Sequence, residues 1–157
     1  MGTAMITIRP FLLSDIPAAE ELEGLNQPQP WSEDVFNDEL VAENRSYLVA
    51  EDDRLVGFAG AMVIDEEAHI TNLLVAPDHR QQGIGGQLVK GLIEISIGMG
   101  AKHLTLEVRS ENSSARRLYS RFGLVPVGAR PGYYGDEDAL VMWVHDIDQP
   151  GYLEGLR

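Results

Sequence analysis

A glycine-rich stretch between Asn72 and Leu88 limits what this chain can fold into more than any other part of its sequence. The apolar residues Leu73–Val75 predict a buried strand, Pro77 begins a turn, and a helix is expected from Gly85. Glycines carry no Cβ, so a ligand can approach the main chain of the loop closely. The first N–H groups of a helix have no partner inside it, and the helix dipole is positive there. We therefore expect the loop to hold an anion such as a pyrophosphate.

The spacing of the loop glycines excludes two common nucleotide-binding motifs. A dinucleotide fingerprint needs G-x-G-x-x-G, but Leu88 occupies the position of the third glycine. No G-x-x-x-x-G-K-S/T sequence is present, so the loop is not a P-loop. The pattern is R-x-x-G-x-G, from Arg80 to Gly85. Taken alone, these six residues leave an ordinary glycine-rich turn as the alternative.

The order of apolar patterns predicts an α/β (mixed α+β) fold. Helices are expected after the capping residues Ser14, Ser32 and Asn112, and over Gly85–Gly98. The early strands follow one another as hairpins and the later ones alternate with helices. This predicts a mixed central sheet of about six or seven strands flanked by about four helices. The predicted strands are Met5–Pro10, Tyr47–Ala50, Leu55–Ile64, His69–Val75, Leu104–Val108, Leu124–Ala129 and Ala139–Val144.

The length of 157 residues suits a single domain over residues 1–157. Pro150 and Gly151 follow the last predicted strand, so a flexible tail is expected from about residue 146. No apolar run is long enough for a membrane helix. The N-terminus has neither a signal-peptide pattern nor a myristoylation pattern, so a cytoplasmic location is expected.

Charge and residue content exclude several classes of function. The formal net charge of −13 repels nucleic acid and anionic lipid and favours cationic partners, so neither nucleic acid nor a membrane is expected as a partner. An acidic surface that merely keeps the chain soluble is the alternative reading of this charge. There is no cysteine, which excludes a cysteine acyl-enzyme and a thiolate zinc site. The four histidines lie too far apart in the sequence for a local metal motif, so no metal is predicted.

A carboxylate in the predicted strand Leu104–Arg109 is a candidate general base. With a period of two, Glu107 lies on the face opposite the apolar residues and near the end of an interior strand. Buried carboxylates are uncommon unless they are paired or functional. Glu107 could take a proton from an incoming amine, or it could pair with Arg109 or another basic residue, or simply be exposed.

A tyrosine in the following predicted helix is a candidate general acid. Tyr119 belongs to an i, i+3, i+4, i+7 stripe with Ala115, Leu118 and Phe122, which also suits a core aromatic. Its hydroxyl could instead protonate a departing thiolate. A free phenol and a free thiol differ in pKa by about 1.5, so the transfer is uphill by about 2 kcal/mol. A site that lowered the pKa of the phenol would make the transfer easier.

Three segments together resemble the core of the GCN5-related N-acetyltransferase (GNAT) superfamily. These are Asn72–Leu88, Leu104–Arg109 and the sequence N-S-S-A-R-R-L-Y-S-R-F-G from Asn112 to Gly123. The resemblance implies acetyl-CoA as cosubstrate, with Glu107 as general base and Tyr119 as general acid. Residues implied in binding acetyl-CoA are Leu73, Leu74, Val75, Arg80, Gln81, Gln82, Gly83, Ile84, Gly85, Gly86 and Asn112. Since CoA is strongly anionic, the site must be a local exception to the acidic surface, with Arg80 and Lys90 as contributors.

Two outer segments are similar to the bacterial ribosomal-protein-alanine N-acetyltransferases, the RimI type. The first is P-Q-P-W-S-E-D-V-F, residues 28–36; the second is G-A-R-P-G-Y-Y followed by E-D-A-L-V-M, residues 128–142. The resemblance implies that Trp31, Tyr133 and Tyr134 shape a peptide slot. It also implies that the acceptor is the N-terminal amine, on alanine, of a small-subunit ribosomal protein. The acidic run Asp136–Asp138 could attract a basic peptide.

Two alternatives stay open at this point. The same core motifs serve acetyltransferases that act on lysine side chains, polyamines or other small amines, and only the Trp31 and Tyr133–Tyr134 segments argue against that reading. The second alternative is a non-catalytic acyl-CoA-binding regulatory module. Such a module would need the glycine loop but neither Glu107 nor Tyr119.

Overall fold

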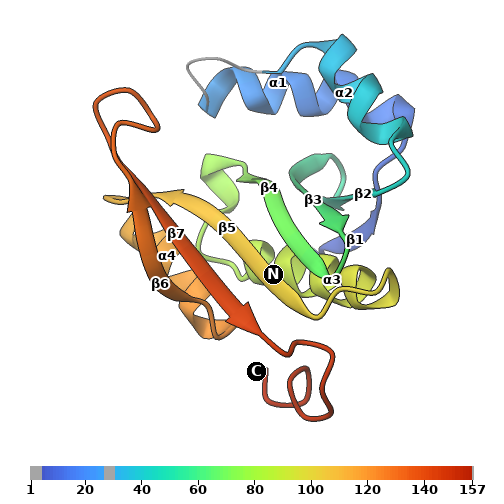
Figure 1. The fold of residues 1–157 in the computed structure, drawn as a ribbon. Coiled ribbons are helices and arrows are strands. Elements are labelled where there is room, and N and C mark those ends of the chain that lie inside the picture. Colours follow the sequence, from blue (N-terminus) through green and yellow to red (C-terminus); the bar gives the residue numbers. More distant parts are fainter. Residues whose placement is uncertain (1–4, 27–30, 157) are drawn as a thin grey trace.

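The computed structural model describes residues 5–26 and 31–156. Within them, seven strands form one sheet in the order β1-β2-β3-β4-β5-β7-β6 (Figure 1). The strands are β1 Thr7–Pro10, β2 Arg45–Glu51, β3 Leu55–Ile64, β4 Glu67–Val75, β5 His103–Arg109, β6 Val125–Arg130 and β7 Ala139–His145. Strands β4 and β5 pair in parallel, whereas the other neighbours are antiparallel. The prediction of a mixed sheet flanked by helices is confirmed.

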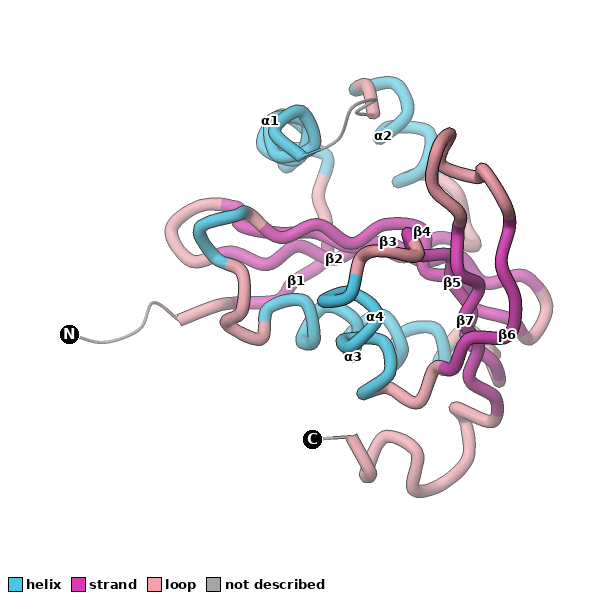
Figure 2. The backbone as a smooth tube through the Cα atoms, turned by 90° about the vertical axis from the view of Figure 1, so that its left-hand side faces the viewer, coloured by secondary structure: helices cyan, strands magenta, loops and turns pink. Residues whose placement is uncertain are grey.

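Helices cover both faces of the sheet (Figure 2). Helices α1 Ile16–Asn26 and α2 Glu33–Val41 lie on one face, and α3 Ile84–Gly98 and α4 Ser113–Arg121 lie on the other. Two short 3₁₀ turns, η1 Leu13–Asp15 and η2 Pro77–His79, precede α1 and α3. None of the helices in the described ranges is long and apolar enough to cross a membrane.

The core has one layer on each side of the sheet. On the α3 side, Leu88, Leu92 and Ile93 are fully buried because they repeat at helical spacing and face β2, β3 and β4. On the other side, aromatic rings hold α2 against the sheet. Phe36 stacks on Phe11 with ring centroids 5.9 Å apart and packs edge-on against Phe58 at 5.7 Å.

Strands β4 and β5 separate after a short paired segment, and this opening positions the site. Their pairing covers only Glu67–His69 and His103–Thr105, although β4 continues to Val75 and β5 to Arg109. Figure 1 shows the two strands spreading apart beyond this point. A register shift against β3 adds one residue, Thr71, to β4. The edge of β4 that faces β5 therefore leaves main-chain groups without strand partners from residue 70 onward.

Two local expectations need correction. Ser14 does not cap a first helix, because it lies inside the turn η1, and the Asp15 carboxylate accepts the Leu12 N–H at 2.8 Å instead. The segment after His145 was expected to be a flexible tail, yet it packs against the domain. Ile147 is 1% exposed there, and the Tyr152 hydroxyl donates to a main-chain carbonyl at the end of α4 at 2.6 Å.

Candidate active site

The glycine loop has the backbone geometry of an anion-binding helix start. Gly83 precedes α3 with a φ of +79°, a conformation that favours glycine. Its lack of a side chain also means that no side-chain oxygen caps the helix, and the first turn contains no acidic residue. The first N–H groups of α3 are therefore available to an anion. Arg80 ties the loop to the end of β4 by donating from Nε to the Val75 carbonyl at 3.2 Å.

One of the loop glycines lies close against the neighbouring helix. A Cβ on Gly85 would lie 3.2 Å from the Leu118 side chain of α4, a tight contact, whereas one on Gly86 would lie at an ordinary distance of 3.8 Å from it. The small residue at position 85 lets α4 approach the start of α3. The loop, α3 and α4 therefore meet at one place.

A cavity of about 270 Å³ opens where β4 and β5 separate. It contains six of the residues predicted from the sequence: Leu73, Leu74, Glu107, Asn112, Tyr119 and Tyr134. Its other walls are Ile70, Thr71, Asn72, Leu106, Val108, Arg109 and Ala115. Asn112 also caps α4, accepting the Ala115 N–H at 3.1 Å, as predicted. The two candidate acid–base groups and the open edge of β4 thus share one space.

A second cavity, of about 310 Å³, lies beside the glycine loop and the start of α3. Gly83, Gly86 and Gln87 form its wall on the side of the loop, and Phe122 and Leu156 supply apolar contacts. Lys90 and Arg121 give it positive charge. Helix α4 borders both spaces, with Asn112, Ala115 and Tyr119 at the first cavity and Arg121 at the second. An elongated ligand could therefore run from one cavity to the other past the glycine loop.

Glu107 is held by partners that the sequence did not suggest. Its side chain is 12% exposed, and Oε2 lies 2.6 Å from Nε2 of His69 on β4. Oε1 lies 3.5 Å from Nη2 of Arg130 on β6. The alternative of a pair with a basic residue is therefore met by His69 and Arg130, whereas Arg109 lies 3.3 Å from Glu137 instead. His69 itself was not predicted as a site residue.

Tyr119 is both a core residue and a wall of the cavity, so the two interpretations of this residue are compatible. Its side chain is 6% exposed, and the residue lines the cavity beside Glu107. Burial, followed by the nearby Tyr134, raises the pKa of the Tyr119 phenol strongly. A lowered pKa, which would have eased proton donation, is therefore not what the site produces. The hydroxyl stays protonated throughout the physiological pH range.

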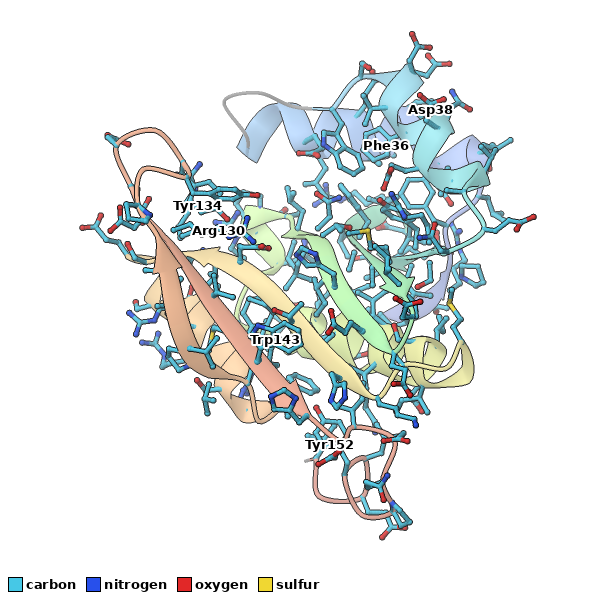
Figure 3. All side chains as sticks on the ribbon, in the orientation of Figure 1. Phe36, Asp38, Arg130, Tyr134, Trp143 and Tyr152 are labelled. Atoms are coloured by element: carbon cyan, nitrogen blue, oxygen red, sulfur yellow. The ribbon has the colours of Figure 1, made fainter. Side chains whose placement is uncertain are left out.

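The three residues expected to shape a peptide slot have different environments. Tyr134 lines the cavity under the Arg109 guanidinium, which lies 4.3 Å from the ring centroid, and burial raises the pKa of its phenol. Figure 3 shows Tyr134 and Arg130 extending from the β6–β7 hairpin toward the middle of the molecule. Tyr133 is 52% exposed. Trp31 packs on the Phe36 ring, with centroids 5.3 Å apart, and is not among the residues that line either cavity.

The acidic run beside the tyrosines is largely engaged in local structure. Glu137 lies 3.3 Å from Arg109 and accepts the Glu111 N–H at 2.9 Å. Asp138 accepts the Gly132 N–H at 2.9 Å. These two carboxylates tie the β6–β7 segment to its neighbours, and both Asp136 and Asp138 remain exposed while Glu137 is partly buried. The N-terminal part of the predicted P-W-S segment, Pro28–Pro30, lies outside the described residues.

Comparison with known proteins gives a consistent assignment. Residues 13–124 match the acetyltransferase (GNAT) family. The ribosomal protein bS18-alanine N-acetyltransferase of Escherichia coli (strain K12) is 33% identical over 142 residues, which cover 88% of this chain and 96% of that protein. A relative from Bacillus subtilis (strain 168), whose name gives the same activity provisionally, is 39% identical over 141 residues, covering 87% and 93% of the two chains.

Solved structures agree with the sequence relatives. The crystal structure of the Escherichia coli ribosomal-protein-S18-alanine N-acetyltransferase superposes with a TM-score of 0.81 at 32% identity, covering 90% of this chain and 94% of that one. Arabidopsis thaliana NAA60, in complex with a bisubstrate analogue, gives a TM-score of 0.82 at 20% identity and covers 90% and 98%. At that level of identity, the second likeness is evidence of the fold alone.

Proposed function

Since the chain belongs to the acetyltransferase (GNAT) family and is an N-acetyltransferase, we propose that it transfers the acetyl group of acetyl-CoA to the N-terminal α-amine of a protein. We propose the N-terminal alanine of ribosomal protein bS18 as the acceptor, because the relatives that match most of the chain carry that activity in their names. The observation that carries the proposal is the single cavity that joins Glu107, Tyr119 and the open edge of β4.

The open edge of β4 and the glycine loop together fit acetyl-CoA. Beyond His69, β4 has no β5 partner, so its main chain can hydrogen-bond to the amides of the pantetheine arm as a neighbouring strand would. The pyrophosphate suits the start of α3 after Gly83. Lys90 and Arg121 border the second cavity, where positive charge suits the phosphates at the nucleotide end. Bound acetyl-CoA supplies an activated thioester.

Glu107 would act on the acceptor amine. An α-amine has a pKa of about 8, so only about a tenth of it is neutral at pH 7. A carboxylate at the cavity wall can take the proton from the amine, directly or through one water molecule. Because the sequence has no cysteine, the amine would attack the thioester directly rather than through a cysteine acyl-enzyme.

Tyr119 would protonate the departing sulfur. Its raised pKa makes it a weaker acid than a free phenol. However, burial disfavours a thiolate in the same cavity for the same reason, so both pKa values move upward together. The cost of transfer then stays close to that estimated for the free groups, about 2 kcal/mol. This is small beside the whole barrier that an enzyme must lower.

The proposal is tested with purified protein, acetyl-CoA and peptides. One set has free N-terminal Ala, Ser, Gly or Met, and includes the N-terminal sequence of bS18. A matched peptide has the same sequence with a blocked N-terminus and an internal lysine. We expect acetylation of the free Ala peptide and none of the blocked one. Acetylation of the blocked peptide, or of spermidine in preference, would replace this proposal with side-chain or small-amine acetylation.

A further inference from the structure

The two oxygens of the Glu107 carboxylate have different surroundings. Oε2 lies 2.6 Å from Nε2 of His69, a short and well-defined contact. Among the described residues, Oε1 has only the Arg130 guanidinium near it, at 3.5 Å and on a side chain that is 58% exposed. One oxygen is therefore fixed by a neighbouring strand, while the other is left for a ligand in the cavity.

His69 reaches Glu107 because of where β4 and β5 part. It pairs with Thr105 in the last paired position of the two strands. Glu107 lies two residues further along β5, so it points to the same face as Thr105. Beyond this position the strands no longer pair, and the His69 ring spans the beginning of the gap. The histidine is 28% exposed, whereas Glu107 is 12% exposed.

We propose that His69 is the positioning residue of Glu107: its ring holds Oε2 by hydrogen bonding and so presents Oε1 to the acceptor amine. This inference rests on the proposed role of Glu107 as general base. The carboxylate at Nε2 selects the tautomer that carries hydrogen on that nitrogen, so neutral His69 donates to Oε2, and protonated His69 donates from the same atom.

The remaining charged groups around Glu107 leave this role to His69. Arg130 of β6 faces Oε1. Tyr134 is close enough for the carboxylate charge to add to the effect of burial in raising the pKa of its phenol. Arg109 lies over the Tyr134 ring and pairs with Glu137, so its charge is directed away from Glu107. Only His69 contacts Oε2 among the described residues.

The test compares three replacements of His69. In His69→Gln, the amide nitrogen can occupy the place of Nε2 and still donate. In His69→Asn the donor is one bond too short, and in His69→Leu it is absent. The matched control is His103→Gln on β5, because His103 faces His145, with 3.1 Å between their Nδ1 atoms, rather than Glu107. All proteins are first checked for acetyl-CoA binding and thermal stability.

Two readouts are collected for each variant. The first is the steady-state kcat and KM for the N-terminal Ala peptide. The second is the position of the Glu107 carboxylate in crystal structures of the variants, which needs no turnover. In His69→Leu and His69→Asn we expect kcat to fall by about tenfold, the effect of losing one hydrogen bond to an ionised group, and the carboxylate to leave its wild-type position. His69→Gln and His103→Gln should stay close to wild type.

The outcomes separate this inference from the function on which it rests. An unchanged kcat and carboxylate position in His69→Leu, or equal changes in His69→Gln, would overturn the positioning role. A wild-type protein that acetylates none of the peptides would overturn the proposed function. The crystal structures would still decide whether His69 positions Glu107, because they need no turnover.

Discussion

The Tyr47 ring lies directly across Gly60 of the neighbouring strand β3, so that a Cβ at position 60 would collide with the ring. Gly60 also pairs with Asn72 on β4, beside the inserted Thr71. The absence of a side chain at this one position therefore allows a buried aromatic ring to cover the strands next to the cavity.

Gly60→Ala should destabilise the fold, because the Tyr47 ring would have to move out of its packed position. We expect a loss of about 1–3 kcal/mol in the free energy of unfolding, measured by urea denaturation. Gly98→Ala is the control, since a Cβ there meets nothing within 4 Å at the end of α3. It should be neutral or stabilise the protein by up to about 1 kcal/mol. Equal stability of Gly60→Ala and wild type would contradict this account.

Glu107→Gln should remove the proton acceptor while keeping the shape of the side chain. We expect kcat to fall by about 100-fold or more, with the Kd for acetyl-CoA kept within about threefold. Steady-state kinetics with the Ala peptide and calorimetric titration of acetyl-CoA measure the two quantities. A variant with wild-type turnover would show that another group takes the proton.

Tyr119→Phe should remove the proton donor while keeping the aromatic ring, which is 6% exposed. We expect kcat to fall by about 100-fold and thermal stability to stay close to wild type, because the lost hydroxyl has no hydrogen-bond partner among the described residues. Rapid-quench measurement of a single turnover reports the chemical step itself. An unchanged single-turnover rate would reduce Tyr119 to a packing residue.

Neutralising the basic wall of the second cavity should weaken acetyl-CoA binding. Lys90→Gln and Arg121→Gln are each expected to raise the Kd by about fivefold at low salt, and by less at high salt, because the attraction is screened. Lys102→Gln is the matched control, since this lysine is paired with Glu66 at 2.8 Å, away from both cavities. Equal effects of all three changes would indicate only a general response to net charge.

Alkaline pH should destabilise the protein through its buried tyrosines. Burial raises the pKa of Tyr152 to about 12 and also raises the pKa values of Tyr47, Tyr119 and Tyr134. An unfolded tyrosine ionises near pH 10, so above that pH the unfolded state loses protons that the folded state keeps. Stability should therefore be level below about pH 10 and fall as the pH rises toward 12. Urea denaturation at pH 8 to 11.5 checks this, and Tyr152→Phe should flatten the decline.

Local signals in the sequence were enough to place most elements. The strand predicted over Leu55–Ile64 has those bounds in the structure, and the central helix starts one residue before its prediction. Asn112 caps α4 and Ser32 caps α2, as predicted. In each case the side-chain oxygen accepts a hydrogen bond from an N–H in the first turn of the helix that follows. Such features depend only on neighbours within a few residues.

Contacts between distant segments could not be predicted in the same way. His69 and Glu107 are 38 residues apart and meet only because of the register of two parallel strands. Arg109 lies on the same face as Glu107, yet the loop between β6 and β7 brings Glu137 to it instead. The raised pKa of Tyr119 depends on how completely α4 and the sheet cover it. Each of these outcomes is set by tertiary packing.

The short pairing between β4 and β5 has a mechanical consequence. Only three residues of each strand join β1–β4 to β5–β7 within the sheet. A ligand bound along the unpaired edge of β4 would supply the main-chain hydrogen bonds that β5 does not make there. It would therefore hold the two halves of the sheet more rigidly together. Binding of acetyl-CoA would then also make the sheet more rigid, before the acceptor amine binds.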